Sequence, residues 1–426
     1  MLSGDRPTTS KVARSVDVPG LWRIEQGLLL ALGVTLVLRG WQILATAYAA
    51  SWQTATGQAT PNGAPNEYFV FSPSGPSPGL GPVLGNWDGE WYERIATLGY
   101  PDATQKLSAN DAWASAFPPG FPLMARIVME ASGLPFVWAS LLLNTVLTLL
   151  ATALLYRLLR SRDVGPRPAS WASIGISLLP SSPVLMAAYS EALALVFLLA
   201  ALRWLTDRRY IFATIAVVGL AFTRPVAVAF VPVVLAHAAI QWRQEPRGPS
   251  WRTSGGVVAL LMCAALSPWM WPWTAAAVYG VPEAADLDGS ARVGHTAKGV
   301  GGYFVFAWEA GGPLVFVLLT LLLALLVGVP AALSRRMGWP PELAVWGASY
   351  LVLVLVVTPV TPGFIRYLVL AAPLLVAIFA APMTRITPLR VGVLAVLVAI
   401  SLWSQWLWIR YLLVLDPAPH LIPWPP

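Results

Sequence analysis

The sequence predicts an all-α polytopic membrane protein, on the basis of its composition and of a series of apolar runs. Hydrophobic residues make up 57% of the 426 residues and charged residues only 11%, and the mean hydropathy is +0.66. A soluble protein of this length has no interior large enough to bury so much apolar surface. The 21 tryptophans, several of them at the ends of apolar runs, are typical of side chains at a membrane interface.

The apolar runs set the expected number of transmembrane helices. A helix needs about 20 apolar residues to cross a hydrocarbon core of about 30 Å. Runs that reach or approach this length occur at residues 24–45, 135–157, 168–180, 184–205, 210–223, 225–242, 254–276, 312–333, 342–358, 364–382 and 389–411. We therefore expect about 11 transmembrane helices in a membrane domain that covers residues 24–411.

Two of these runs are too short to cross the bilayer. The run 168–180 ends at Pro180 and the run 210–223 ends before Arg224, so each helix would rise only about 20 Å. Non-helical backbone at that depth must lie against protein or a water-filled cavity. We therefore expect a cavity open to the extracytoplasmic side, with Glu191 and Arg224 in its wall.

Basic residues set the expected orientation, because Lys and Arg are enriched in cytoplasmic connections. Placing the N-terminus in the cytosol puts most of the 27 Lys and Arg residues on that side. We then expect a cytoplasmic tail at residues 1–23, extracytoplasmic loops at 46–134 and 277–311, and an extracytoplasmic tail at 412–426. The usage of Arg over Lys fits a bacterial plasma membrane.

Several other classes of protein are not supported. The net charge of +7 does not predict nucleic-acid binding, because the basic residues form small clusters between apolar runs instead of one stripe. Cys263 is the only cysteine, so no internal disulfide can form. No Walker-type loop and no metal-ligand spacing occurs, which leaves ATP-driven transport and a structural zinc site unsupported. We expect no cofactor, although an acidic outer site could bind a divalent metal.

The longest polar interval contains the stretch NWDGEWYERIATLGY, residues 86–100. It combines carboxylates with aromatic rings, a mixture that suits a sugar, although an amphipathic helix on the bilayer surface would carry the same residues. Residues 88–98 and the following 116–127 are compatible with two short helices in the plane of the membrane. Asp88 is the leading candidate for a general base that takes a proton from a hydroxyl. The alternative role for Asp88 is an N-cap.

Ionisable side chains within or beside apolar runs are costly and are functional candidates. Glu191 lies in such a run, and Arg224 and Arg366 border the same expected cavity. A guanidinium fits a phosphate through its planar fork, so both arginines are candidates for holding a phosphorylated lipid headgroup. Either arginine could instead be the ion-pair partner of Glu191. His295 and Lys298 form a second polar patch, for which donor binding is the functional interpretation.

Three stretches carry a resemblance to a known family. The first is WDGEWYERIATLGYP with the following AFPPGFPLMARI, the second is AAYSEALALVFLLAAL, and the third is TRPVAVAF with FIRYLVLAAPLL. Together they resemble the PIG-V-type mannosyltransferases of the GT-C glycosyltransferase superfamily. In that family a Trp-Asp-Gly precedes an aromatic residue, an Ile-Ala, a Gly-Tyr and a Phe-Pro-x-x-Pro group. The resemblance covers most of the membrane region in order.

The resemblance implies a GT-C fold whose first extracytoplasmic loop carries the catalytic aspartate, which by motif position is Asp88. It implies an inverting transfer of a sugar, typically mannose, from a polyprenyl-phosphate donor to a glycolipid or glycan acceptor, among membrane lipids. The residues expected to bind the sugar or the acceptor are Trp87, Glu90, Trp91, Tyr92 and Glu191. The alternatives are a transporter or flippase of lipid-linked sugars and a GT-C enzyme that uses another polyprenyl-phosphate sugar.

Overall fold

A computed structural model of the chain describes residues 25–56, 71–101, 114–244, 251–280, 284–358 and 364–415. Every regular element in these residues is helical. Five helices are long and apolar enough to cross a membrane, or six if one bent pair counts as a single span. The chain is therefore an all-α, multi-pass membrane protein, as predicted. The number of about 11 spans and the GT-C fold stay predictions, and the two predicted tails lie almost entirely outside the described residues.

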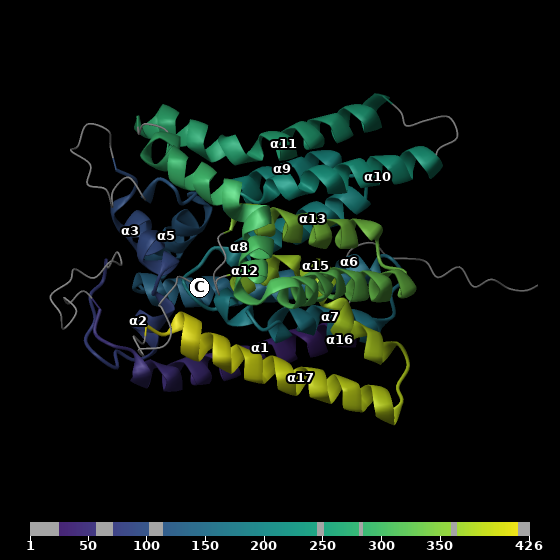
Figure 1. The fold of residues 1–426 in the computed structure, drawn as a ribbon, viewed down its shortest axis with the longest axis horizontal. Helices are drawn as coiled ribbons and strands as arrows, with labels where there is room; N and C mark the ends of the chain where they lie inside the picture. Colours follow the sequence, from purple (N-terminus) through teal and green to yellow (C-terminus); the bar gives the residue numbers. More distant parts are fainter. Residues whose placement is uncertain are drawn as a thin grey trace, which may run out of the picture.

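Parallel and antiparallel helices form one bundle (Figure 1). The longer helices are α1 (Gln26–Ala49), α6 (Phe136–Arg160), α11 (Trp251–Tyr279), α12 (Ala284–Arg336) and α17 (Pro388–Trp408). The shorter ones are α7 (Pro166–Leu178), α8 (Glu191–Thr206), α9 (Tyr210–Ala221), α10 (Phe230–Gln244) and α13 (Pro341–Val357). Each apolar run of the sequence coincides with one of these helices, except the run 364–382, which is divided.

The run 364–382 forms a chain of short turns instead of one helix. These are α14 (Phe364–Tyr367), η4 (Leu368–Ala371), α15 (Ala372–Leu375), α16 (Ala377–Ala380) and η5 (Ala381–Thr384). The axis bends by 48° near the middle of this segment. Pro373 and Pro382 lie within it, and each removes a backbone donor that a continuous helix needs.

The two ends of the bundle differ in character. The short helices α2 (Leu80–Leu84), α3 (Asp88–Leu98) and α5 (Gly120–Ser132) gather at one end, and the α16–α17 connection lies at the other (Figure 1). At this second end Arg162 in the α6–α7 connection pairs with Asp207 in the α8–α9 connection. The connections predicted to be cytoplasmic therefore meet at one end, away from the Asp88 segment. Which end faces the cytosol stays a prediction.

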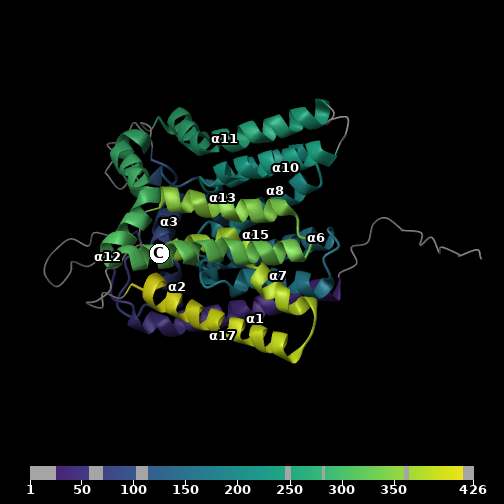
Figure 2. The ribbon, with the colours of Figure 1, turned by 45° about the vertical axis from the view of Figure 1, so that its right-hand side comes forward.

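The segment predicted as a second outer loop, 277–311, is helical from Ala284 onward because it belongs to α12. This helix changes direction along its length (Figure 2). Gly312 has a left-handed φ of +62°, and Pro313 follows it, so a straight α-helix cannot continue through this point. The segment is therefore polar in sequence but helical in structure from Ala284 onward.

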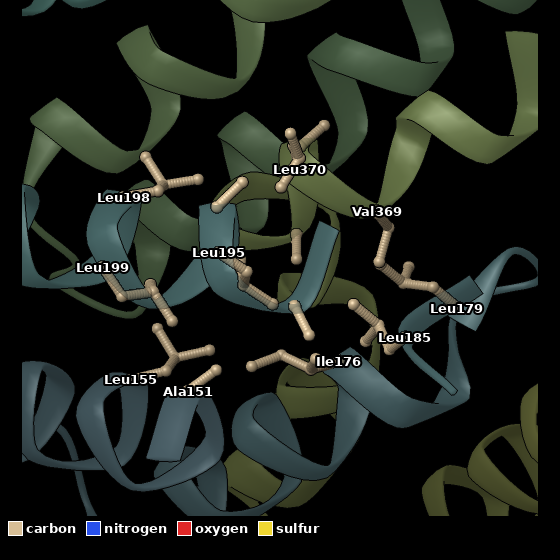
Figure 3. Packing of buried hydrophobic residues seen from close by; sticks show 14 of the residues in the cluster. Ala151, Leu155, Ile176, Leu179, Leu185, Leu195, Leu198, Leu199, Val369 and Leu370 are labelled. Atoms are coloured by element: carbon tan, nitrogen blue, oxygen red, sulfur yellow. The ribbon is translucent and has the colours of Figure 1, made fainter. Parts of the chain in front are cut away.

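The core lies where α6, α7, α8 and the divided segment meet (Figure 3). Leu155, Ile176, Leu195 and Val369 each come from a different one of these elements and are fully buried. Gly175 allows a close approach between α7 and the divided segment: a Cβ atom at this position would lie 2.9 Å from side-chain atoms of Val376 and Phe379. Small residues at such contacts let helix backbones pack closely, which is how helices associate in a membrane.

Candidate functional site

Four charged side chains from separate segments meet near the end of the bundle that carries α3. Asp88 is the first residue of α3 and Glu191 is the first residue of α8. Arg224 follows α9, and Arg366 lies in α14. The two carboxylates thus occupy helix N-termini, where the helix dipole stabilises negative charge. The sequence singled out all four residues, and the structure places them in one ion-pair cluster.

Arg366 connects the two carboxylates. Its Nη2 atom donates to Oδ2 of Asp88, and its Nε atom donates to Oε1 of Glu191 at 2.5 Å. The guanidinium lies over the ring of Tyr189, with 4.3 Å between its central carbon and the ring centroid. The side chain is only 1% exposed. Arg366 is therefore held on several sides in one orientation.

Arg224 makes the second pair with Glu191. Its Nη1 atom lies 2.7 Å from Oε1 of Glu191 and 3.2 Å from Oγ of Ser190. The same Ser190 hydroxyl accepts a hydrogen bond from the hydroxyl of Tyr92 at 2.8 Å. Among the described residues, Nε of Arg224 and Oε2 of Glu191 have no hydrogen-bond partner. Both arginines thus pair with Glu191, the alternative that the sequence left open.

Exposure differs sharply across the cluster. Asp88 is 25% exposed, Arg224 is 11% exposed, and Glu191 is fully buried. Glu191 therefore lies behind the arginines instead of in the wall of an open cavity, which corrects that expectation. Two guanidiniums and two carboxylates make the cluster formally neutral, so the buried charges compensate one another. Only its edge, at Asp88 and Arg224, is open to a ligand.

A strained backbone directs Asp88 toward this cluster. Trp87 has a φ of +60°, a conformation that bulky side chains rarely adopt. Its indole Nε1 donates to the carbonyl of Leu412 at 3.1 Å, and the neighbouring Asn86 donates to the carbonyl of Leu413 at 2.9 Å. The N-cap position of α3 is Trp87, and Asp88 makes no capping bond. The N-cap interpretation of Asp88 is therefore wrong.

Polar side chains also support the non-helical backbone before Glu191. The helix α7 ends at Leu178, close to the end predicted for the short run, and residues 181–195 are all buried. The side-chain amide of Asn144 donates to the carbonyls of Ala187 and Tyr189, and Arg39 donates to that of Leu185. The irregular segment thus lies against protein, which is one of the surroundings in which non-helical backbone is tolerated at membrane depth. Glu191 is fixed by this scaffold.

The Pro-rich motif that follows α3 supports Arg224. The backbone N–H of Gly120 donates to the carbonyl of Phe222 at 2.8 Å. A Cβ atom at Gly120 would lie 2.7 Å from Oγ1 of Thr223 and 2.8 Å from the same carbonyl. Only glycine fits here without a shift of the Arg224 segment. The motif that carried the family resemblance is thus a packing element of the site.

The aromatic residues proposed to bind sugar have different surroundings. Trp91 stacks on Phe117 with ring centroids 5.7 Å apart, and it is partly exposed. Tyr92 is buried against Phe117 and Phe121. Trp87 is partly exposed and bound through its indole to the C-terminal end of the described chain. Trp87 and Trp91 are therefore partly accessible to a ligand, whereas Tyr92 is buried and its hydroxyl donates to Ser190.

Glu90 anchors the backbone of a neighbouring segment. Its Oε2 atom accepts hydrogen bonds from the backbone N–H groups of Phe71 and Ser72 at 2.5 and 2.9 Å, and the side chain is buried. Burial raises the pKa of Glu90 from an ordinary value of 4.5 to about 7, against the lowering effect of these hydrogen bonds. A sugar contact of Glu90 stays a prediction. Its described contacts are structural.

The raised pKa of Glu90 gives a pH prediction. Between pH 4.5 and about 7 the folded protein binds a proton at Glu90 that the unfolded chain has released. The free energy of unfolding should therefore fall as the pH rises through this window, by at most about 1.4 kcal/mol per unit. Thermal unfolding of Glu90→Gln should lack this component, whereas the exposed Glu130→Gln should retain it. An unchanged pH profile in Glu90→Gln would contradict the prediction.

Two proposed donor-binding residues cannot be placed. His295 and Lys298 lie in the part of α12 whose side chains the structure does not describe. Among the described residues, no group of three or more His, Cys, Asp and Glu side chains is positioned to hold a metal ion.

Comparison with known proteins adds no family. Neither the protein-family models nor the curated proteins compared with this chain yield a match. The resemblance to PIG-V-type enzymes thus rests on the motifs of the sequence.

Three further residues of the cluster are Tyr189, Ser190 and Tyr367, which lie in the family-like motifs and were not predicted as site residues. Tyr189 and Ser190 precede Glu191 directly, and Tyr367 follows Arg366. Tyr189 and Tyr367 lie beside the guanidiniums, and Ser190 joins Tyr92 to Arg224. The sequence signal that could have identified them is their position next to Glu191 and Arg366. A tyrosine ring beside an arginine can also contribute a cation–π contact.

Proposed function

We propose that the chain is a glycosyltransferase that moves a sugar, mannose by its sequence resemblance, from a polyprenyl-phosphate donor to an acceptor hydroxyl. One observation carries the proposal. Asp88 is held by the buried Arg366 and lies next to Arg224, at the one edge of the described cluster that is partly exposed. Oδ2 of Asp88 is engaged by Arg366, and no described side chain donates to Oδ1. That oxygen is available to accept the proton of an incoming hydroxyl.

The chemistry follows from this arrangement. The acceptor hydroxyl gives its proton to Asp88, its oxygen bonds to the anomeric carbon, and the bond from that carbon to the phosphate oxygen breaks. Attack from the face opposite the phosphate inverts the configuration. The departing polyprenyl phosphate gains one negative charge, which a nearby guanidinium stabilises. Binding both reactants at one edge supplies the orientation that the reaction needs.

The two arginines have different roles in this proposal. Arg366 has two carboxylate partners and almost no exposure, which suits a positioning residue for Asp88 better than a phosphate ligand. Arg224 is the more exposed of the two arginines, at 11% against 1% for Arg366, so we assign the donor phosphate to Arg224. This division revises the expectation that both arginines bind phosphate.

Membranes that contain the chain test the proposal directly. They should form a new glycosidic product when incubated with polyprenyl-phosphomannose and a mixture of glycolipid acceptors, with the product identified by its mass. Polyprenyl-phosphate donors of glucose and arabinose, supplied in parallel, determine the sugar. Movement of the donor between leaflets without any product would instead favour a transporter or flippase.

A further inference from the structure

A second feature lies at the opposite end of the bundle from Asp88. A cavity of about 1120 Å³ lies between α12 and α17, with Ile378 of α16 and residues of η5 also in its wall. Residues 163–168, in the α6–α7 connection and at the start of α7, close one side. This volume is slightly above the usual range of small-molecule pockets. No residue of the Asp88 cluster lines it.

Arginines surround the cavity at the ends of its helices. Its lining includes one carboxylate, that of Asp163, and four arginines: Arg167, Arg336, Arg385 and Arg390. No ion pair joins any of them to a carboxylate of the described residues, and three of them are exposed. Arg390 donates to Oγ1 of Thr384, which fixes its guanidinium at the rim. The rim is therefore strongly positive and offers several donors to an anion.

The walls are apolar from the rim inward. Val329 and Leu333 lie on α12, and Val393 and Leu397 lie on α17. Val329 precedes Arg336 by seven residues, and Leu397 follows Arg390 by seven, so each wall extends about 10 Å from the arginines along its helix. Both helices are candidate membrane spans, and the arginines stand at their ends. The cavity thus passes from headgroup level into the hydrocarbon region.

We propose that this cavity binds an anionic glycerophospholipid from the leaflet at the basic end of the bundle. The phosphate lies among Arg336, Arg385 and Arg390, and the first carbons of the acyl chains lie against Val329 and Val393. A soluble phosphate compound would use the rim and leave the apolar walls exposed to water. A basic pocket between membrane helices that continues into an apolar groove matches the two parts of such a lipid. The site is separate from the proposed transferase site.

Native mass spectrometry of the full chain tests this proposal. The protein is purified in a neutral detergent and titrated with phosphatidylglycerol or phosphatidylcholine. Phosphatidylglycerol should be retained at least tenfold more strongly than phosphatidylcholine. The double variant Arg336→Gln, Arg385→Gln should lose this preference, and Val393→Trp, which fills the groove, should lower the retention of phosphatidylglycerol.

A matched control removes the same charge outside the cavity. Arg335 and Arg243 are exposed, lie near the same end of the bundle and do not line the cavity. The variant Arg335→Gln, Arg243→Gln should keep the lipid preference. An equal loss in both double variants would show only a general charge effect and overturn the site. Displacement by glycerol 3-phosphate at the same concentration as the lipid would overturn the lipid assignment in favour of a soluble anion. Monodisperse elution of each variant verifies folding.

Discussion

Asp88→Asn should lower the rate of sugar transfer by about 10²- to 10⁴-fold, the usual range for the loss of a general base. Asparagine has nearly the same shape and its carbonyl oxygen can still accept from Arg366, but it cannot take a proton at neutral pH. The apparent affinity for the donor should change little, because Arg224 keeps its contacts. Rates and donor dependence are measured with polyprenyl-phosphomannose and membranes that contain equal amounts of each protein.

Glu93→Gln provides the control for this variant. Glu93 is also a carboxylate on α3, and it is partly exposed and contacts the hydroxyl of Ser72 instead of an arginine. Its amide should leave the rate within a few-fold of the native value. Full turnover by Asp88→Asn would remove Asp88 from the mechanism. An equal loss in both variants would point to the surface charge of α3.

Glu191→Gln should destabilise the protein by about 3–5 kcal/mol, the usual cost of breaking a buried ion pair from one side. The carboxylate is fully buried and is shared by Arg224 and Arg366, so its loss leaves two guanidiniums with only Asp88 as a described counter-charge. The midpoint of thermal unfolding should fall, and activity should fall with it, because Arg366 then no longer has a fixed orientation. Unfolding is followed in a neutral detergent.

An exposed ion pair supplies the comparison. Glu25 pairs with Arg160, and both side chains are substantially exposed, so Glu25→Gln should cost less than about 1 kcal/mol. Adding Arg224→Met to Glu191→Gln should recover part of the lost stability, because it removes one of the uncompensated charges. Equal midpoints for Glu191→Gln and Glu25→Gln would contradict the role of Glu191 as the shared buried counter-charge.

The sequence predicted the membrane class from its apolar composition, and it predicted three of the four members of the charged cluster for a separate physical reason. A charge in an apolar run has a high desolvation cost, so Glu191, Arg224 and Arg366 stood out without any knowledge of their neighbours. The early end of α7 was also predictable, because proline and serine residues interrupt its run. Local composition determines both features.

Contacts between helices were less predictable. Gln405 of α17 donates to the carbonyl of Ser177 at the end of α7. Gln42 of α1 donates in turn to Gln405 and to Ser182. Helices that are apolar on every side give no periodicity from which to read their rotation. For the same reason the sequence could not show that Arg366, and not Arg224, reaches Asp88.

The ion pairs of the cluster also determine when the site can exist during biosynthesis. Arg366 is synthesised 175 residues after Glu191 and 278 residues after Asp88. At about 5–20 residues per second the ribosome needs roughly 9 to 35 s to cover the shorter interval. During that time Glu191 has Arg224 as its only cluster partner and Asp88 has none. A nascent chain that ends before residue 366 therefore lacks the cluster partner of Asp88 and one of the two cluster partners of Glu191.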